Sequence, residues 1–283
     1  QRALSSALDQ SFDNYEIIII DDASTDDTSK IVGVYKVKYP NLRYYKLPKN
    51  RGLSYARNFG ISKAKSKYIV CLDDDNELLP NFLKETVAMI QGTEFKAVCV
   101  GKIIKYEDFE DYAPPYSGKY IAIDWGWLIK KKVFDHIKYD NDLRANEDTD
   151  FGIRFMKRYK YMGINKPLAI AFDMEGDPRQ SLSFPNEREL NGFTLFLKKN
   201  LHEYTDPKEL RVLLRAAGRR FYRGGFKLKG LDYFWKSFLA EKNFNSLIHF
   251  IVILFGWSLY DKFMTLTEKV GAKNRTKILH DNS

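Results

Sequence analysis

Two short apolar runs, each followed immediately by clustered aspartates, constrain the fold of this chain most. The run Glu16–Ile20 is β-branched and stops at Asp21 and Asp22, and the run Tyr68–Leu72 stops at the triplet 73–75. Short, continuous β-branched runs are typical of buried strands in alternating α/β proteins. The sequence therefore predicts two buried strands whose carboxyl ends carry clustered carboxylates.

Helical and extended patterns alternate around these two runs. Further strands are predicted over Leu42–Leu47, Ala97–Tyr106 and Ile121–Lys130. Helices are predicted over Ser24–Tyr39, Leu53–Lys63, Pro80–Gln91 and Glu147–Tyr159. Strands and helices that alternate at this spacing favour a Rossmann-like α/β fold, with a mostly parallel sheet flanked by helices.

The last third of the chain has a different composition. A polar loop over 173–186 precedes helical patterns at 187–201, 206–221, 229–241 and 244–265. We expect an α/β domain over 1–185 and a helical extension over 186–283. The net charge of +9 is divided unevenly between them: residues 1–180 carry 28 Lys and Arg against 27 Asp and Glu, whereas residues 181–283 carry 18 against 10.

Composition excludes several classes of protein. The apolar fraction of 44% suits a globular protein with a core rather than a disordered chain. Two cysteines, Cys71 and Cys99, are too few for a disulfide scaffold or a Cys-rich zinc module. The longest apolar segment, Leu247–Tyr260, is shorter than the roughly 20 residues of a membrane-spanning helix.

The clustered aspartates predict a cation and a diphosphate. In doubly wound sheets, ligands bind at the carboxyl ends of the strands. Like charges packed there are costly unless a cation or hydrogen-bond donors meet them, and oxygen-only ligands suit Mg²⁺ or Mn²⁺, which often bind substrate phosphates. The alternative is that these aspartates only form turns and caps. Neither GxxxxGK[ST] nor GxGxxG occurs, which disfavours an ATPase and a standard dinucleotide-binding enzyme.

Four segments, in order, resemble the GT-A-fold glycosyltransferases of family 2. Glu16–Thr28 resembles the first nucleotide-binding motif, and Asn50–Gly60 resembles the family's second segment. Tyr68–Pro80 resembles the DXD strand, and Asn146–Arg154 resembles the ED helix. The resemblance covers about residues 1–185, and the remaining third matches only loosely, as a variable helical extension.

The resemblance implies roles for the residues that bind the donor. Asp22 would accept a hydrogen bond from the nucleotide base, and Asp21 would support its loop. Arg57 would steady the diphosphate. Asp73 and Asp75 would be the DXD pair, with Asp73 near the ribose and Asp75 holding the metal; both stand among the expected metal ligands.

The middle position of the DXD motif and the ED helix complete the expected site. Asp74 fills the middle position of the motif, and Asn76 stands where a further aspartate is common in the family. Asp148 would be the general base, with Glu147 beside it. The alternative reading of Glu147 and Asp148 is plain capping of the helix.

The implied reaction is a single displacement. A base deprotonates the acceptor hydroxyl as that oxygen attacks the anomeric carbon, and a nucleoside diphosphate leaves with its charge neutralised by the metal. The expected activity is therefore an inverting hexosyl or N-acetylhexosaminyl transfer from a nucleotide-diphospho-sugar, with uridine favoured, to a glycan or lipid-linked acceptor in cell-surface polysaccharide synthesis. Because the family normally opens with a further strand, we expect this sequence to be a fragment that lacks it.

Two further segments carry expectations about the acceptor. Aromatic residues in and after the loop 107–119, namely Tyr112, Tyr116, Trp125 and Trp127, would stack on sugars, or the tryptophans would belong to the core. Arg179, in the loop that follows the expected base, would close over phosphates, or it is an ordinary surface arginine.

The basic tail predicts contact with a membrane surface. Arg211, Arg215 and Arg219 recur every four residues, near aromatic residues and the segment Leu247–Tyr260. Cationic stripes beside apolar helices fit in-plane attachment to anionic lipid, which places the protein at the cytoplasmic face of the cell membrane. The alternatives are a solvated basic face and burial of 247–260 against the catalytic domain.

Two other functions stay open at this point. A nucleotidyltransferase that makes the sugar nucleotide also uses a Rossmann-like sheet and Mg²⁺, although the ED helix disfavours it. A nucleic-acid binder driven by the basic tail would need a recognised reading element, and the sequence contains no such pattern, so we expect no nucleic-acid partner.

Overall fold

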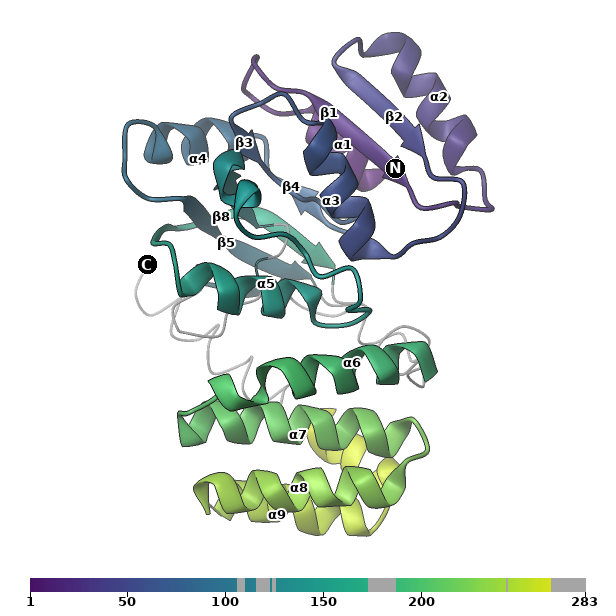
Figure 1. Ribbon diagram of the computed structural model, residues 1–283, viewed down its shortest axis with the longest axis vertical. Helices are drawn as coiled ribbons and strands as arrows, with labels where there is room; N and C mark the ends of the chain where they lie inside the picture. The colour runs from purple at the N-terminus through teal and green to yellow at the C-terminus, as the bar shows by residue number, and fades with distance from the viewer. Residues whose placement is uncertain (106–109, 116–122, 124–125, 173–186, 243, 266–283) are drawn as a thin grey trace. The chain divides into compact units, whose positions relative to one another are not determined.

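The computed structural model describes residues 1–105, 110–115, 123, 126–172, 187–242 and 244–265 (Figure 1). The chain divides into two compact units, residues 1–176 and 177–283. The boundary expected at 185/186 falls at the edge of the segment 173–186, which lies outside the described residues, as does Arg179. Each unit is described by itself.

The first unit is built from strands and helices that alternate along the chain. Its strands are β1 (Ile17–Asp21), β2 (Leu42–Lys46), β3 (Tyr68–Ile69), β4 (Glu77–Leu78), β5 (Ala97–Lys105), β6 (Glu110–Ala113), β7 (Trp127–Lys130) and β8 (Tyr161–Phe172). Its helices are α1 (Arg2–Leu8), α2 (Thr28–Lys38), α3 (Leu53–Lys63), α4 (Phe82–Ile90), the short 3₁₀ helix η1 (Lys131–Asp135) and α5 (Glu147–Met156).

The expected α/β class is confirmed, but the strand directions correct the expectation of a mostly parallel sheet. β1 and β2 form a parallel pair of their own. The larger sheet has the order β3-β7-β5-β8-β4, with β6 beside β5, and of its pairings only β5 with β8 is parallel. The sheet is mixed because β7 enters it antiparallel to both β3 and β5.

The core of this unit lies on both faces of β5. Ala97 and Cys99 contact a cluster that includes Phe151 and Phe155 of α5. Val98, the residue between them, contacts a second cluster with Phe82 and Ile90 of α4. Because successive side chains of a strand point to opposite faces, a continuous apolar run is what a strand covered on both sides requires.

Strand β8 was missed by sequence analysis, and its irregularity explains why. Gly163, Asn165 and Pro167 interrupt its apolar pattern, and its register against β5 shifts on either side of Gly101. A Cβ on Gly101 would lie 2.4 Å from the Tyr112 hydroxyl and 2.8 Å from the Lys166 carbonyl oxygen. Glycine is therefore needed at this position of β5, where a side chain would collide with both neighbouring strands.

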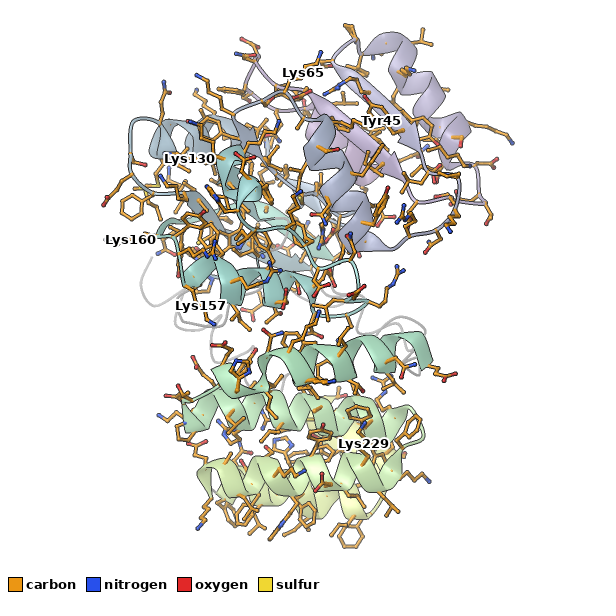
Figure 2. All side chains as sticks on the ribbon, in the orientation of Figure 1. Tyr45, Lys65, Lys130, Lys157, Lys160 and Lys229 are labelled. Atoms are coloured by element: carbon orange, nitrogen blue, oxygen red, sulfur yellow. The ribbon has the colours of Figure 1, made fainter. Side chains whose placement is uncertain are left out.

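The second unit is helical among its described residues, as expected. It contains α6 (Glu187–Asn200), the 3₁₀ turn η2 (Leu201–Glu203), α7 (Pro207–Arg223), α8 (Lys227–Glu241) and α9 (Phe244–Leu254). Asp206 caps α7 by accepting hydrogen bonds from the amides of Lys208 and Glu209, with Pro207 in the first turn. Lys229, labelled in Figure 2, belongs to α8. Its Nζ lies 3.9 Å from the centroid of the Phe221 ring of α7.

Two expectations about this unit are wrong in detail. The helix expected over 244–265 is interrupted at Phe255 and Gly256, where Gly256 has a φ of +107°, and resumes at 257. The arginines at 211 and 215 do not form an exposed stripe: Arg211 is ion-paired with Glu241 and is 15% exposed, and burial lowers the pKa of Arg215. Within the residues that the structure describes, no helix combines the length and apolar character that crossing a membrane requires.

Candidate active site

Asp22 holds the turn that opens helix α3. Its two carboxylate oxygens accept hydrogen bonds from the backbone amides of Arg51, at 2.7 Å, and Gly52, at 2.6 Å. Gly52 has a φ of +86°, in the left-handed region that favours glycine. The contact of Asp22 with a nucleotide base stays a prediction; the geometry fixes the carboxylate at the end of β1 against the second motif.

Asp21 supports the same loop from inside. It is buried, accepts a 2.6 Å hydrogen bond from the Ser24 amide and a short one from the Tyr44 hydroxyl, and has Lys46 Nζ at 3.6 Å. Burial raises the pKa of Asp21, but the hydrogen bonds and Lys46 lower it by more than burial raises it. The net shift of the pKa is therefore downward, and the carboxylate is ionised. Since Ser24 is engaged here, α2 begins at Thr28, which Asp26 holds, rather than at Ser24.

Arg57 joins the two acidic motifs. One terminal nitrogen donates to Asp73 Oδ1 at 2.8 Å and the other to Glu147 Oε1 at 3.0 Å, and the side chain is only 8% exposed. Burial alone would lower the pKa of Arg57, yet the surrounding groups, Tyr139 and Asp73 among them, raise it well above its ordinary value. The guanidinium is therefore a permanent cation between the strand-end carboxylates and helix α5.

Asp75, the last carboxylate of the triplet, has a raised pKa. Burial, and after it the negative charges of Asp73 and Asp74, raise its pKa. Asn76, itself buried, donates to Asp75 Oδ1 at 2.7 Å and orients it. The Asn76 side chain, at the position where an aspartate was expected, thus makes a contact with Asp75 that the sequence did not predict.

Asp73 and Asp75 fit the ligand set of a hard divalent cation. Both offer carboxylate oxygens, and a bound cation would offset the repulsion that Asp73 and Asp74 exert on Asp75. Groups of three or more His, Cys, Asp or Glu side chains able to hold a metal do not occur among the described residues. A cation here would therefore complete its shell with water or ligand oxygens, as Mg²⁺ commonly does.

Helix α5 presents Glu147 and Asp148 in its first turn, after Asn146 with a left-handed φ of 58°. Glu147 is 12% exposed and committed to Arg57; burial and the neighbouring Asp148 charge raise its pKa. Asp148 is partly exposed and accepts a 2.6 Å hydrogen bond from the Thr149 amide. The helix N-terminus stabilises negative charge at both positions.

Two stacked aromatic side chains pack next to Arg57, and the sequence did not predict them. Tyr139 is buried, lies 5.2 Å from Arg57 Cζ by its ring centroid, and stacks on Phe151 of α5 at 4.5 Å. Burial raises the pKa of Tyr139 well above its ordinary value. It also raises the pKa of the neighbouring Cys71 thiol. The spacing of Tyr139 to Phe151 carries no periodic signal, so only the fold brings them together.

The aromatic residues expected to meet sugars are separated by the structure. Trp127 is fully buried and packs on Tyr161 at 5.0 Å, so it belongs to the core. The Tyr112 hydroxyl donates a 2.8 Å hydrogen bond to Asn165 Oδ1 on β8. Tyr116 and Trp125 lie outside the described residues.

Comparison with known proteins gives relatives along much of the chain. The colanic acid biosynthesis glycosyl transferase WcaA of Escherichia coli is 30% identical over 176 residues, 56% of this chain and 61% of its own. Glycosyltransferase GlyG of Streptococcus pneumoniae is 25% identical, and the match covers 57% of this chain and 62% of GlyG. The minor teichoic acid biosynthesis protein GgaB of Bacillus subtilis is 38% identical over 233 residues, 75% of this chain and 26% of GgaB. The chain thus spans about three fifths of WcaA and GlyG.

Solved structures give the fold. TarS of S. aureus in complex with UDP-GlcNAc superposes with a TM-score of 0.57 at 20% identity, covering 84% of this chain and 76% of that one. GalNAc-T7 with UDP, GalNAc and Mn²⁺ gives 0.55 at 16% identity over 82% of this chain and 51% of that one. These likenesses confirm the predicted GT-A fold. The sequence profile of glycosyl transferase family 2 matches residues 1–162, and the chain belongs to that family.

Proposed function

We propose that this protein is an inverting glycosyltransferase that moves a sugar from a UDP-sugar to a hydroxyl of a glycan or lipid-linked acceptor, in the synthesis of a cell-surface polysaccharide. The observation that carries the proposal is the Arg57 bridge, which holds the expected DXD carboxylate Asp73 next to the ED helix at Glu147. Relatives named for colanic acid and teichoic acid biosynthesis, and neighbours bound to UDP-GlcNAc or UDP, support it.

On the donor side, Asp22 and the turn it holds would receive the nucleotide base. Asp73 and Asp75 would hold a Mg²⁺ or Mn²⁺ ion, a choice supported by the Mn²⁺ of GalNAc-T7. When bound, such an ion neutralises charge on a departing diphosphate. Arg57 would act by fixing Asp73 and Glu147 in place, since both of its terminal nitrogens are engaged by them.

On the acceptor side, Asp148 would remove the proton of the attacking hydroxyl. Glu147 is the poorer candidate because its carboxylate is ion-paired with Arg57 and nearly buried. Asp148 is partly exposed in the first turn of α5, where the helix N-terminus favours its ionised form. The deprotonated acceptor oxygen would attack the anomeric carbon from the side opposite the departing nucleoside diphosphate. One such displacement inverts the configuration of the anomeric carbon.

Membership of glycosyl transferase family 2 favours sugar transfer over synthesis of the sugar nucleotide. The direct experiment is a screen of UDP-sugars and other nucleotide-sugars with Mg²⁺ or Mn²⁺, in which released nucleotide is measured. We expect release from at least one UDP-sugar by the wild-type protein and loss of release in Asp75→Ala. The exposed Lys132→Ala variant serves as the matched control. No release with any donor contradicts the proposal.

The same proposal places the protein peripherally at the cytoplasmic face of the cell membrane. Phe226 and Leu228, which are 53% and 85% exposed, flank the exposed Lys227, and Phe244 and Phe255 of the same unit are also exposed. Apolar and cationic side chains side by side fit anionic lipid surfaces. Flotation with vesicles containing anionic lipid should carry the wild-type protein upward and leave Phe226→Ser/Leu228→Ser behind; equal flotation of both, or of neither, contradicts this attachment.

A further inference from the structure

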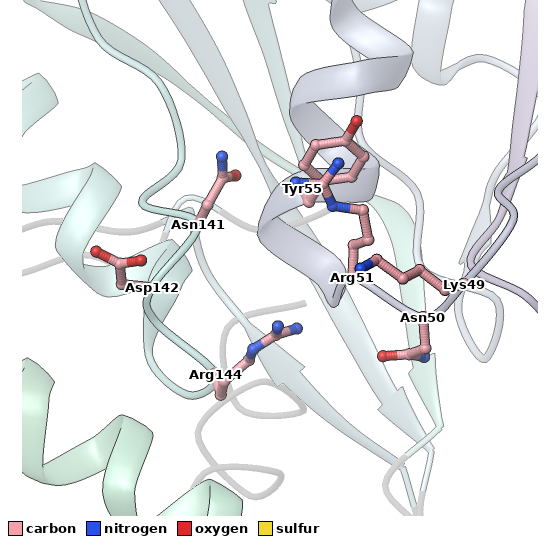
Figure 3. Close-up of a pocket in the computed structure, with 7 residues that line it drawn as sticks. All are labelled: Lys49, Asn50, Arg51, Tyr55, Asn141, Asp142 and Arg144. Carbon is pink, nitrogen blue, oxygen red and sulfur yellow. The ribbon is translucent and has the colours of Figure 1, made fainter.

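Helix α7 of the helical unit carries a row of arginines. The arginines recur at every fourth residue, at positions 211, 215, 219 and 223. Because residues four apart on a helix are neighbours on its surface, these side chains form one row along α7. The row is separate from the cationic pocket of the first unit shown in Figure 3, which borders the turn that Asp22 holds and belongs to the proposed donor site.

The two ends of this arginine row have partners within the unit. At one end, Arg211 is ion-paired with Glu241, the last residue of α8. At the other end, the Arg223 guanidinium lies over the Trp257 ring, 5.1 Å from its centroid. The row therefore runs from the end of α8 to the segment that follows α9.

The two middle arginines have no counter-charge. Among the residues that the structure describes, the side chains of Arg215 and Arg219 form neither an ion pair nor a hydrogen bond. Both are half-buried, so solvent still reaches part of each side chain. Burial lowers the pKa of Arg215, and the charges of Arg219 and Arg211 act in the same direction. A cation partly removed from water beside like charges is unfavourable unless an anion compensates it.

The segment 244–260, which includes α9, supplies no such anion. It contains no Asp, Glu, Lys or Arg. Its buried His249 has Nδ1 3.1 Å from the buried Tyr260 hydroxyl. Burial, and then the charges of the arginines at 215, 219 and 211, lower the pKa of His249 to about 4, so the ring is neutral at pH 7. The middle of the arginine row therefore lies near a neutral histidine and tyrosine instead of a carboxylate.

We propose that Arg215 and Arg219 form a binding site for a phosphate group. Each guanidinium presents N–H donors in a fork that matches phosphate oxygens, and the charge of one phosphate would relieve the repulsion between the two arginines. The segment 244–260 also exposes Leu254, Phe255 and Leu259, so a lipid headgroup and a soluble phosphate ester are the two sources of this group that the unit suits. The site lies in the helical unit and needs neither donor nor metal, so the inference goes beyond the proposed function.

The test uses the full chain in a metal-free buffer with EDTA, so that metal-dependent binding of phosphates at Asp73 and Asp75 does not contribute. Two probes carry the same group: glycerol 3-phosphate in solution, and phosphatidic acid in phosphatidylcholine vesicles. We expect the wild-type protein to bind at least one probe, and Arg215→Gln and Arg219→Gln each to raise its Kd about tenfold, the effect of losing one charge-assisted hydrogen bond. Lys208→Gln, at an exposed position of the same helix, is the matched control and should leave the Kd unchanged.

The two probes distinguish the sources of the phosphate. Weaker binding of glycerol 3-phosphate by both arginine variants supports a site for a soluble phosphate ester, and weaker binding of the vesicles alone supports a site for a lipid headgroup. A wild-type protein that binds neither probe overturns the inference without any variant. Retained binding in both arginine variants overturns it, and so does an equal loss in Lys208→Gln, because the effect would then be one of net charge.

A second measurement separates a binding site from a structural role. In phosphate-free buffer, Arg215→Gln and Arg219→Gln each remove an unpaired, half-buried charge, so their free energy of unfolding in urea should equal or exceed that of the wild-type protein. A clear loss of stability in both variants would show that the arginines hold the helices together, and would overturn the inference. Neither measurement involves nucleotide release, so failure of the proposed function is read separately, from the donor screen.

Discussion

Arg57 and Glu147 are 90 residues apart in the sequence and are joined by a 3.0 Å ion pair in a nearly buried setting. The same guanidinium reaches Asp73 at 2.8 Å. One side chain thus aligns the end of the run Tyr68–Leu72 with the helix that carries the proposed base. Asp73 and Glu147 are both carboxylates and repel each other. The Arg57 cation between them is therefore what allows them to lie together.

Replacing Arg57 by methionine should destabilise the protein strongly. Removing one partner of a buried ion pair leaves uncompensated charge, which typically costs about 3–5 kcal/mol. Arg57→Lys should recover only part of this, because an ammonium does not present two parallel donors. The free energy of unfolding in urea measures the effect, with the exposed Arg158→Met as the control. Equal stability of the two methionine variants would show that the bridge contributes nothing.

The acidic motifs are predictable from the sequence because each follows a short β-branched run or opens a helix, and both signals are local. Sequence analysis predicted the α/β class and the helical tail for the same reason. It missed β8, whose pattern Gly163 and Pro167 interrupt, and it missed the antiparallel entry of β7, because pairing direction depends on residues far apart. The contacts of Arg57 with Asp73 and Glu147 could not be predicted because neither carboxylate is near it in sequence, and its contact with the diphosphate stays a prediction.

Substitution of Gly230 tests the packing of α7 against α8, with Gly33 of α2 as the comparison. A Cβ on Gly230 would lie 2.7 Å from the backbone nitrogen and the Cβ of Tyr222, and 2.9 Å from the Gly218 carbonyl oxygen. Gly230→Ala should therefore destabilise the helical unit by about 1–3 kcal/mol through overpacking. Gly33→Ala in α2 meets nothing within 4 Å and should stabilise by about 0.5–1 kcal/mol. Thermal unfolding checks both; the same sign for the two variants refutes the packing.

His249 gives the helical unit a defined dependence on pH. Burial, and then the positive charges of Arg215, Arg219 and Arg211, lower its pKa from 6.5 to about 4. Its Nδ1 lies 3.1 Å from the buried Tyr260 hydroxyl. Between these two pKa values the unfolded chain binds a proton that the folded chain does not, so stability is full above pH 6.5 and falls as the pH drops toward 4.

The expected loss over that range is of the order of 3 kcal/mol, from about 1.4 kcal/mol per pKa unit. Unfolding in urea at a series of pH values measures it. In His249→Gln the difference between pH 7 and pH 4 should shrink by that amount. Substitution of the exposed His202 by Gln is the control and should leave the difference unchanged. An unaltered pH profile in His249→Gln contradicts the assignment.

Removal of divalent metal should abolish nucleotide release and weaken UDP binding. Asp75→Asn keeps the shape of the side chain but removes the negative charge that the cation needs. We expect the concentration of Mn²⁺ that gives half-maximal release to rise at least about tenfold, the effect of 1.4 kcal/mol of lost interaction. Asp135→Asn, at an exposed position outside the expected site, is the matched control. Unchanged release in the presence of a chelator refutes the metal assignment.

The most direct measurement of the central claim is the rate of UDP release by Asp148→Asn with the donor that the screen identifies, together with its affinity for UDP. A general base contributes roughly 10²–10⁴-fold to such rates. The account predicts a fall of at least about a hundredfold in the rate, with UDP affinity within about twofold of wild type and an unchanged free energy of unfolding. Wild-type turnover in Asp148→Asn would contradict it.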